Sequence, residues 1–248
     1  MTTCDTAKID AQKSEIDSYR PFKESVVKRL REYFKIGLTY SSNALEGNTL
    51  TESETKVVLE DGITIGGKPV KYHLEALGHS DAYDFMHSVV SRSTICEKDI
   101  LELHRLFYFR IDEDDSGKYR TEPVIITGSD AEFPRPKEIP QLMTQFMAKV
   151  PALKSAAHPV IFAAQLHIEF VNIHPFIDGN GRTARLLLNL ALLQAGYGLA
   201  IIPPILRSQY ISAVAQAQKG REQPFLDFIV DIVWESQKDY LRVLKALN

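Results

Sequence analysis

The sequence is poor in cysteine, in charge of one sign and in long apolar runs. Only Cys4 and Cys96 occur among 248 residues, too few for a disulfide framework or a cysteine metal site, and this favours a reducing cytoplasm. The chain has 29 basic and 32 acidic residues, a net charge of −3. Its overall charge therefore gives no reason to expect binding to DNA or to an anionic membrane.

No segment has the character of a signal peptide or a membrane span. The N-terminal sequence MTTCDTAKIDAQKSEID is polar and charged. The most apolar segment, 186–195, is interrupted by Asn189 and Gln194 and falls well short of the ~20 apolar residues that a spanning helix needs. We therefore expect a soluble protein without a membrane partner.

Most of the chain has the hydrophobic periodicity of helices. Apolar residues recur at helical spacing in nine segments, which we predict as helices: 19–40, 52–60, 69–91, 97–110, 136–150, 159–172, 181–195, 207–219 and 224–248. Thr51 and Glu54 have the spacing of a capping box at the start of the second of these. The helix 181–195 is apolar on nearly every side, so it should lie buried at the centre of the protein.

Segment 112–140 differs from the rest of the chain. It is rich in turn residues and contains a β-branched run at 124–127, directly before Gly128. This pattern predicts a short β-hairpin, while three prolines between residues 134 and 140 discourage a longer sheet. The expected fold is mainly α: a single domain over residues 1–248, built of helices with a short β-hairpin.

The stretch HPFIDGNGRTAR, residues 174–185, leads into the most apolar helix. Gly179 and Gly181 would let the backbone approach a ligand closely, at the positive end of the helix dipole. Arg182 and Arg185 are three residues apart and hence on one face, where they could bind phosphate oxygens. These features together are typical of a phosphate-binding site.

Two further residues of this stretch have the chemistry of nucleotide transfer. Asp178 offers a hard oxygen ligand to a Mg²⁺ ion that phosphates bind for the most part. His174 could act as a general base near neutral pH. Each feature alone has an ordinary explanation, such as a turn, a tight start to a helix or a surface ion pair. Their occurrence together in twelve contiguous residues favours a functional site.

Residues 174–185 match the signature HPFx(D/E)GNGRxxR of the Fic family at every defining position, and the chain resembles that family over most of its length. AAQLHIEFVNI resembles the helix before the family's loop, GKYRTEPVIITG its substrate-binding flap, and SSNALEGNTLTESET its N-terminal segment. The resemblance implies a helical domain with a β-hairpin flap. It also implies transfer of AMP from Mg-ATP to a hydroxyl side chain of a target protein, with release of pyrophosphate.

The resemblance assigns a role to each residue of the loop. His174 would deprotonate a Tyr, Thr or Ser hydroxyl of the target, which then attacks the α-phosphorus of ATP. Phe176 would anchor the loop in the core, and Asp178 would hold Mg²⁺. Gly179, Asn180 and Gly181 would form the anion hole. Arg182 would bind the transferring and leaving phosphates, and Arg185 would bind the γ-phosphate. A subgroup that transfers phosphate has an altered GNGR sequence; this chain keeps GNGR, which favours adenylyl transfer.

A second motif, SNALEG at residues 42–47, matches the family's inhibitory pattern (S/T)xxxE(G/N). Ser42 and Glu46 are four residues apart and so would share one face of a short helix. Without the loop, a capped surface turn would explain this motif. The resemblance implies that Glu46 pairs with Arg185 in the γ-phosphate position. The chain would then be an autoinhibited adenylyltransferase of the subgroup with an N-terminal inhibitory helix, class II.

Two other functions are compatible with the same residues. Glu46 could position a water molecule that removes AMP from a modified target, which would make the chain a deAMPylating hydrolase. In a different class, the chain could be a catalytically idle module that binds ATP and signals to a partner through its shape. The presence of His174 and Asp178 favours an enzyme, because binding alone needs only the glycines and arginines.

The remaining histidines carry weaker signals. His167 precedes the loop on a predicted helix, and we expect a hydrogen-bonded core residue there. His104 and four others share no metal-ligand spacing, so the sequence assigns them no role. Asn189 is expected to serve packing or hydrogen bonding near the nucleotide.

The resemblance also divides the chain and suggests partners. Residues 1–95 would form a helical region with the inhibitory helix at about 40–47, and residues 96–248 the Fic core. The flap would pair with the target backbone, and the candidate contact residues are Val124, Ile125, Ile126, Thr127 and Phe133. About 60 residues follow the loop, which leaves no room for the winged-helix module of some members and argues against DNA binding. A homo-oligomer stays compatible with the sequence.

Overall fold

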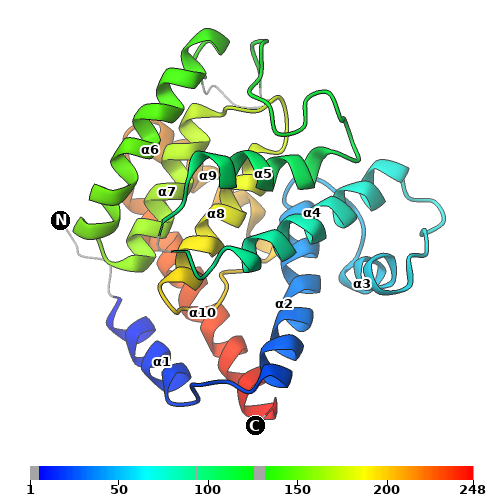
Figure 1. The fold of residues 1–248 in the computed structure, drawn as a ribbon, viewed down its shortest axis with the longest axis vertical. Coiled ribbons are helices and arrows are strands. Elements are labelled where there is room, and N and C mark those ends of the chain that lie inside the picture. Colours follow the sequence, from blue (N-terminus) through cyan, green and yellow to red (C-terminus); the bar gives the residue numbers. More distant parts are fainter. Residues whose placement is uncertain (1–5, 93, 126–131, 248) are drawn as a thin grey trace.

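The computed structural model describes residues 6–92, 94–125 and 132–247, and all regular secondary structure in these residues is helical (Figure 1). The α-helices are α1 Ala7–Asp17, α2 Glu24–Ala44, α3 Glu52–Asp61, α4 Val70–Ser88, α5 Glu97–Tyr108, α6 Ile139–Ala156, α7 Pro159–Ile173, α8 Asn180–Gln194, α9 Arg207–Gln218 and α10 Gln223–Leu247. Short 3-10 helices, Pro136–Glu138 and Pro204–Leu206, precede α6 and α9. The predicted mainly α-helical fold is confirmed, and α1 is a helix that the periodicity did not reveal.

The ends of several helices follow from local side-chain chemistry. At the start of α3, Thr51 Oγ1 accepts from the Glu54 N–H at 3.2 Å, and Glu54 Oε2 accepts from the Thr51 N–H at 2.7 Å. This is the predicted capping box, and it satisfies two donors that a helix start leaves without partners. α3 ends at Asp61, and the next residue, Gly62, caps it at φ +67°, a conformation that glycine adopts without a steric penalty.

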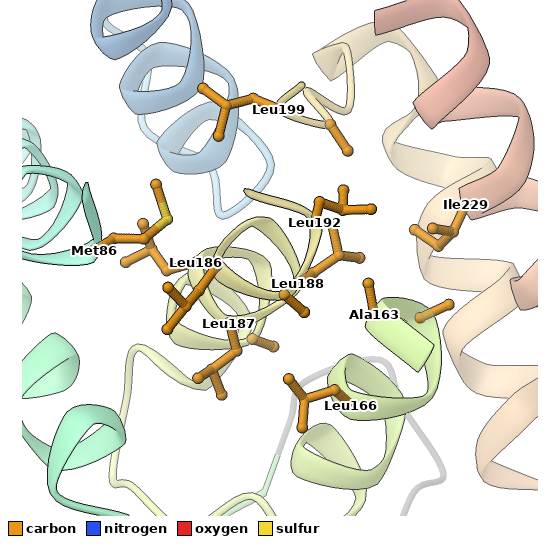
Figure 2. Packing of buried hydrophobic residues seen from close by; sticks show 14 of the residues in the cluster. Met86, Ala163, Leu166, Leu186, Leu187, Leu188, Leu192, Leu199 and Ile229 are labelled. Carbon is orange, nitrogen blue, oxygen red and sulfur yellow. The ribbon is translucent and has the colours of Figure 1, made fainter. Parts of the chain in front are cut away.

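Helix α8 lies at the centre of the protein, with α7, α4, α5 and α2 packed around it. Figure 2 shows Leu186, Leu187, Leu188 and Leu192 on different sides of α8, close to side chains from α4, α7 and α10. Each of these leucines is 2% exposed or less. Because burial of a leucine contributes about 2 kcal/mol, α8 is fixed firmly in the core, and its N-terminal end is a rigid place for a site.

The β-hairpin predicted within 112–140 is not found in the described part of that segment. Residues 119–125 and 132–135 contain no strand, and the centre of the expected hairpin, with Ile126 and Thr127, lies outside the described residues. Two physical causes are visible. Prolines interrupt both arms of the expected hairpin, residues 119–125 and 132–135, and supply no N–H donor. The carbonyls of Glu122 and Pro134, which a strand partner would need, accept hydrogen bonds from the Arg120 side chain at 3.0 and 2.7 Å.

Within the described residues, no helix combines the length and the apolar character required to cross a membrane.

Candidate active site

The loop between α7 and α8 is shaped by short-range hydrogen bonds. His174 terminates α7 in the left-handed conformation, at φ +50°, and its N–H donates to the Phe170 carbonyl at 3.1 Å. The Asn180 amide accepts from the Phe176 N–H at 2.9 Å and donates to the Phe176 carbonyl at 2.8 Å. The Asn180 side chain therefore closes the loop upon itself, and only its backbone N–H is left to face a ligand at the start of α8.

Phe176 and His104 anchor the loop on its buried side. Phe176 is fully buried, and its ring stacks on that of His104 with centroids 3.7 Å apart. His104 Nδ1 accepts from the Gly117 N–H at 2.9 Å, so its Nε2 carries the proton and donates to the Asp178 carbonyl at 3.0 Å. Burial lowers the pKa of His104 to about 4, which keeps this imidazole neutral. The sequence gave no spacing signal for this loop-supporting role.

Asp178 points into a basic environment at the start of α8. Its Oδ1 accepts from Arg182 Nη2 at 3.0 Å, and its Oδ2 lies 3.7 Å from Lys71 Nζ. Burial raises the pKa of Asp178, but Arg182, the Gly179 N–H and Lys71 together lower it below its ordinary value. The carboxylate is therefore ionised at neutral pH and 41% exposed, as a metal ligand should be.

The described surroundings of Asp178 do not form a multi-ligand metal site. Among the described residues, no group of three or more His, Cys, Asp or Glu side chains is arranged to hold a metal ion. A single exposed carboxylate beside a phosphate-binding loop still fits Mg²⁺, because this ion keeps several waters and binds to proteins through one or two carboxylates together with substrate phosphates. The donor set does not suit a metal that requires nitrogen or sulfur ligands.

Arg182 is almost fully buried and bridges two carboxylates. Besides Asp178, it binds Oε1 of Glu75 through Nη1 at 2.9 Å, and its guanidinium lies over the Phe107 ring at 4.4 Å. Glu75 is 5% exposed, and its Oε2 accepts from Asn48 Nδ2 at 2.9 Å. Nε of Arg182 has no hydrogen-bond partner in the described part of the chain. Glu75 is a site residue that the sequence analysis missed, since an isolated glutamate on a helix has no distinguishing pattern.

Arg185 is 3% exposed and is held from three sides. Its Nε donates to Ser42 Oγ at 3.0 Å, and its Nη2 donates both to the Ser42 carbonyl and to Glu46 Oε1, each at 2.8 Å. Its Nη1 donates to the Tyr210 hydroxyl at 3.3 Å, which in turn lies 2.9 Å from Nε2 of His167. His167 is thus the expected hydrogen-bonded core histidine, while the contribution of Tyr210 from α9 was not visible in the sequence.

Glu46 lies directly after α2, not in a separate short helix. The Glu46 N–H donates to the Asn43 carbonyl at 3.0 Å, so the chain makes one more turn past the end of α2 at Ala44. A methyl group at Gly181 would overlap Glu46 Oε1, which places this carboxylate against the backbone at the start of α8. Burial raises the pKa of Glu46, but Arg185 and Arg182 lower it below its ordinary value, so the carboxylate is charged. An anion therefore lies at the start of α8.

His174 is half-buried at the edge of the same site. Burial lowers its pKa to about 4, so the imidazole is neutral at pH 7 and able to accept a proton. Its Nδ1 lies 3.4 Å from the Val171 carbonyl; with the proton on Nδ1, Nε2 carries the free lone pair. The ring of Phe133 packs on the His174 ring with centroids 4.2 Å apart.

The tertiary structure brings most of the sequence-predicted site residues together. His174, Asp178 and the first turn of α8 form one cluster, and Ser42 and Glu46 reach it from α2. Of the flap candidates that the structure describes, Phe133 contacts this cluster through the His174 ring. Val124 is half-buried and Ile125 is 90% exposed, while Ile126 and Thr127 lie outside the described residues.

The fold and the loop define a helical protein with an anion-binding geometry at the start of its central helix. The sequence model of the Fic/DOC family matches residues 94–192, which include α5, α7, the loop and most of α8. A solved Fic domain containing signaling protein from Bacteroides thetaiotaomicron is 30% identical. The two structures superpose with a TM-score of 0.85, over 96% of this chain and 98% of that one. The chain belongs to the Fic/DOC family.

Other relatives agree with this assignment. Fic-1 (residues 134–508) from Caenorhabditis elegans has a TM-score of 0.86 at 28% identity, over 98% of this chain and 74% of that one. The protein named protein adenylyltransferase Fic from Drosophila persimilis is 36% identical over 97% of this chain. Its namesake from Drosophila grimshawi is 40% identical over 82% of this chain. The alignments span 48% and 42% of these two relatives, so this chain corresponds to about half of their length.

Proposed function

We propose that the chain is a protein adenylyltransferase that transfers AMP from ATP to a Ser, Thr or Tyr hydroxyl of a target protein and that Glu46 inhibits. The observation that carries the proposal is the position of the Glu46 carboxylate. It lies on Arg185 and against Gly181, where a phosphate of ATP would otherwise bind, with His174 and Asp178 on the adjoining loop. The names of the Drosophila relatives give independent support.

The proposed reaction assigns His174 the role of general base. Neutral Nε2 accepts the proton of the target hydroxyl as its oxygen bonds to the α-phosphorus of ATP, and the bond from that phosphorus to the pyrophosphate oxygen breaks. A base of low pKa holds its proton weakly, so His174 can pass it on to solvent after the transfer. The protein contributes positioning and charge stabilisation, which dominate catalysis of transfer at phosphorus.

The cation-binding and anion-binding groups lie at the start of α8. The free N–H groups of Asn180 and Gly181 and the two arginines would bind the phosphates. Asp178 would hold Mg²⁺, which neutralises charge on the phosphate oxygens and orients them. Because Asp178 also pairs with Arg182, the same carboxylate aligns one of the phosphate-binding arginines.

The inhibition follows from competition for Arg185. Arg185 Nη2 donates to the Glu46 carboxylate, and the γ-phosphate would require the same charged donor, so the two anions would exclude each other. With Glu46 in place, ATP would bind with its phosphates displaced and its α-phosphorus out of line with the incoming hydroxyl. Ser42 holds Arg185 through both its hydroxyl and its carbonyl, so it belongs to the same inhibitory contact.

The first test replaces Glu46 by Gly. We expect incorporation of label from α-labelled ATP, in the presence of Mg²⁺, to rise at least tenfold over wild type, on the protein itself or on a protein of a cell lysate. His174→Ala in the same background should abolish the incorporation. Glu222→Gly is a matched control, because Glu222 is an exposed loop residue without a side-chain partner among the described residues. Unchanged incorporation in Glu46→Gly would refute the inhibitory role.

A second assay separates the proposed transfer from hydrolysis. A target modified with AMP by the Glu46→Gly variant is incubated with wild type, with the Glu46→Gly variant and with buffer. If Glu46 positions water for removal of AMP, only wild type should release the label. Equal release by both proteins excludes that activity. Binding of ATP by both proteins, without transfer in either direction, would favour an idle nucleotide-binding module.

The proposal extends to domains and partners. We propose that residues 1–95 act as an N-terminal regulatory region and that residues 96–248 form the Fic core, as in a Fic protein of class II. We also propose that the protein works in a reducing cytoplasm, where the exposed Cys96 would stay a free thiol. The target segment would pair with the flap. The exposed Ile125 and the contact of Phe133 with His174 support this placement. No DNA partner is proposed, and a homo-oligomer is a matter for solution measurement.

A further inference from the structure

We propose that Arg120 is a positioning residue. Its backbone and side chain together fix the main chain of His174 relative to the two described arms of the adjoining flap, residues 119–125 and 132–135. The proposal rests on the proposed function only in naming His174 as the base. Arg120 lies outside the signature loop, 54 residues before His174 in the sequence.

Each hydrogen bond that Arg120 donates to the described residues goes to a backbone carbonyl. Its Nε donates to the His174 carbonyl at 2.9 Å, and its own N–H donates to the next carbonyl, that of Pro175, at 2.9 Å. Its Nη1 donates to the Glu122 carbonyl at 3.0 Å, and its Nη2 to the Pro134 carbonyl at 2.7 Å. One residue therefore joins three separate pieces of chain.

The burial of Arg120 shows that this arrangement is not incidental. The residue is 3% exposed, and no carboxylate lies within ion-pair distance of it in the described residues. A buried guanidinium without a counter-charge is costly, and burial lowers the pKa of Arg120. Hydrogen bonds from all three guanidinium nitrogens offset that cost, so the carbonyl positions are set by the planar geometry of the fork.

The contacts of Arg120 converge on a strained residue. His174 has φ +50°, which a non-glycine residue adopts only where its surroundings enforce it. Its N–H is held by Phe170 and its carbonyl by Arg120, so the peptide groups on both sides of its Cα are fixed. That backbone sets the direction of the Cα–Cβ bond from which the imidazole extends.

The Arg120 guanidinium also fixes the position of the Phe133 ring, which covers His174. Pro134, whose carbonyl it binds, directly follows Phe133, and the Phe133 ring packs on the imidazole. The Glu122 carbonyl lies in the opposite arm of the flap. A target segment that pairs along either arm would therefore be placed relative to His174 through a single side chain.

The test compares Arg120→Lys with its parent in the Glu46→Gly background. Lysine keeps the charge but is a point donor, which cannot reproduce three planar contacts. We expect kcat for autoadenylylation with Mg-ATP to fall about ten- to a hundredfold, as for a misplaced catalytic group, while KM for ATP changes less than twofold. Arg110→Lys is the matched control, since Arg110 is exposed and binds Asp81; its kcat should match the parent.

Two measurements separate positioning from loss of fold. Calorimetric titration with a non-hydrolysable ATP analogue should give the parent's affinity and a stoichiometry near one, and the His174 ring Cε1–H resonance should shift in Arg120→Lys but not in Arg110→Lys. A kcat within twofold of the parent, or a binding stoichiometry that falls in proportion to kcat, overturns the proposal. The resonance is observed without turnover. If the parent itself transfers no AMP, an unmoved resonance refutes the role of Arg120, and a shifted one supports it.

Discussion

The two partners of the Arg185–Glu46 ion pair differ in how firmly they are held. Its side chain is 4% exposed and bonded to Ser42 and Tyr210 as well as to Glu46, whereas the side chain of Glu46 is 34% exposed. Loss of Glu46 would leave the guanidinium in place, because its other partners lie in α2 and α9. Under the proposed function, the arginine would thus be preorganised for a phosphate, and the carboxylate would be the part that leaves.

The low pKa of His174 gives a prediction on pH. A general base must be neutral, and an imidazole with a pKa of about 4 stays neutral down to pH 5.5. We therefore expect the transfer rate of Glu46→Gly at saturating ATP to change less than twofold between pH 7.5 and pH 5.5. An imidazole of ordinary pKa, 6.5, would lose about tenfold over this range. Initial rates, with circular dichroism at each pH as the check on folding, decide between the two profiles.

At the scale of elements, the site is the junction of α2 with α8. α8 supplies the N–H groups and both arginines, and α2 ends where Glu46 reaches them. The last turn of α2 is itself held from α9, because Arg207 Nε donates to the Leu45 carbonyl at 2.7 Å. The proposed inhibition would therefore depend on the relative position of these helices as well as on one ion pair.

Gly181 tests whether Glu46 and ATP share one space. A methyl group there would overlap Glu46 Oε1, the flexible end of a side chain that can move away. A phosphate that needs the same position would still be excluded. We expect Gly181→Ala to displace Glu46 without activating the protein, and to weaken binding of an ATP analogue at least tenfold in the Glu46→Gly background, as measured by calorimetric titration. Equal affinity with and without the methyl group would show that the phosphates bind elsewhere.

At the scale of the whole molecule, buried neutral histidines make stability depend on pH. Burial lowers the pKa of His79 and His167 to about 3 and that of His104 to about 4. The unfolded chain, with ordinary imidazoles of pKa about 6.5, binds more protons below that pH. The contribution of these buried histidines to the free energy of unfolding is therefore fully present above pH 6.5 and is lost as the pH falls toward 4.

The loss should be measurable at mild acidity. One imidazole whose pKa is about 4 in the fold and 6.5 in the unfolded chain removes about 2 kcal/mol between pH 7 and pH 5. Several such residues should lower the thermal midpoint by at least about 5 °C, since a chain of this size loses about 2–4 °C per kcal/mol. Differential scanning calorimetry at both values of pH checks this. An unchanged midpoint would mean that these histidines are solvated.

The expected hairpin shows where sequence patterns stop being informative. The β-branched run and the following glycine have the local character of a hairpin. The described arms, residues 119–125 and 132–135, are instead joined through the Arg120 side chain, and no backbone hydrogen bond pairs their described residues as strands. The partners of Arg185 could not be predicted for the same reason, because they come from distant parts of the chain. Tyr210 lies 25 residues away from it and Ser42 143, and no local pattern encodes such contacts.

The sequence by itself determined that α8 is buried, that it begins at a glycine-rich loop with two arginines, and that a histidine and a carboxylate lie in the same loop. These are local properties: an all-round apolar helix cannot be exposed, and the order of residues around a helix start follows from 3.6 residues per turn. Only the tertiary structure decided which carboxylate each arginine binds, that His104 supports the loop, that Glu75 holds Arg182, and that Arg120 joins the loop to residues 122 and 134. Those contacts link residues far apart in the chain, and the packing of the helices around α8 brings them together.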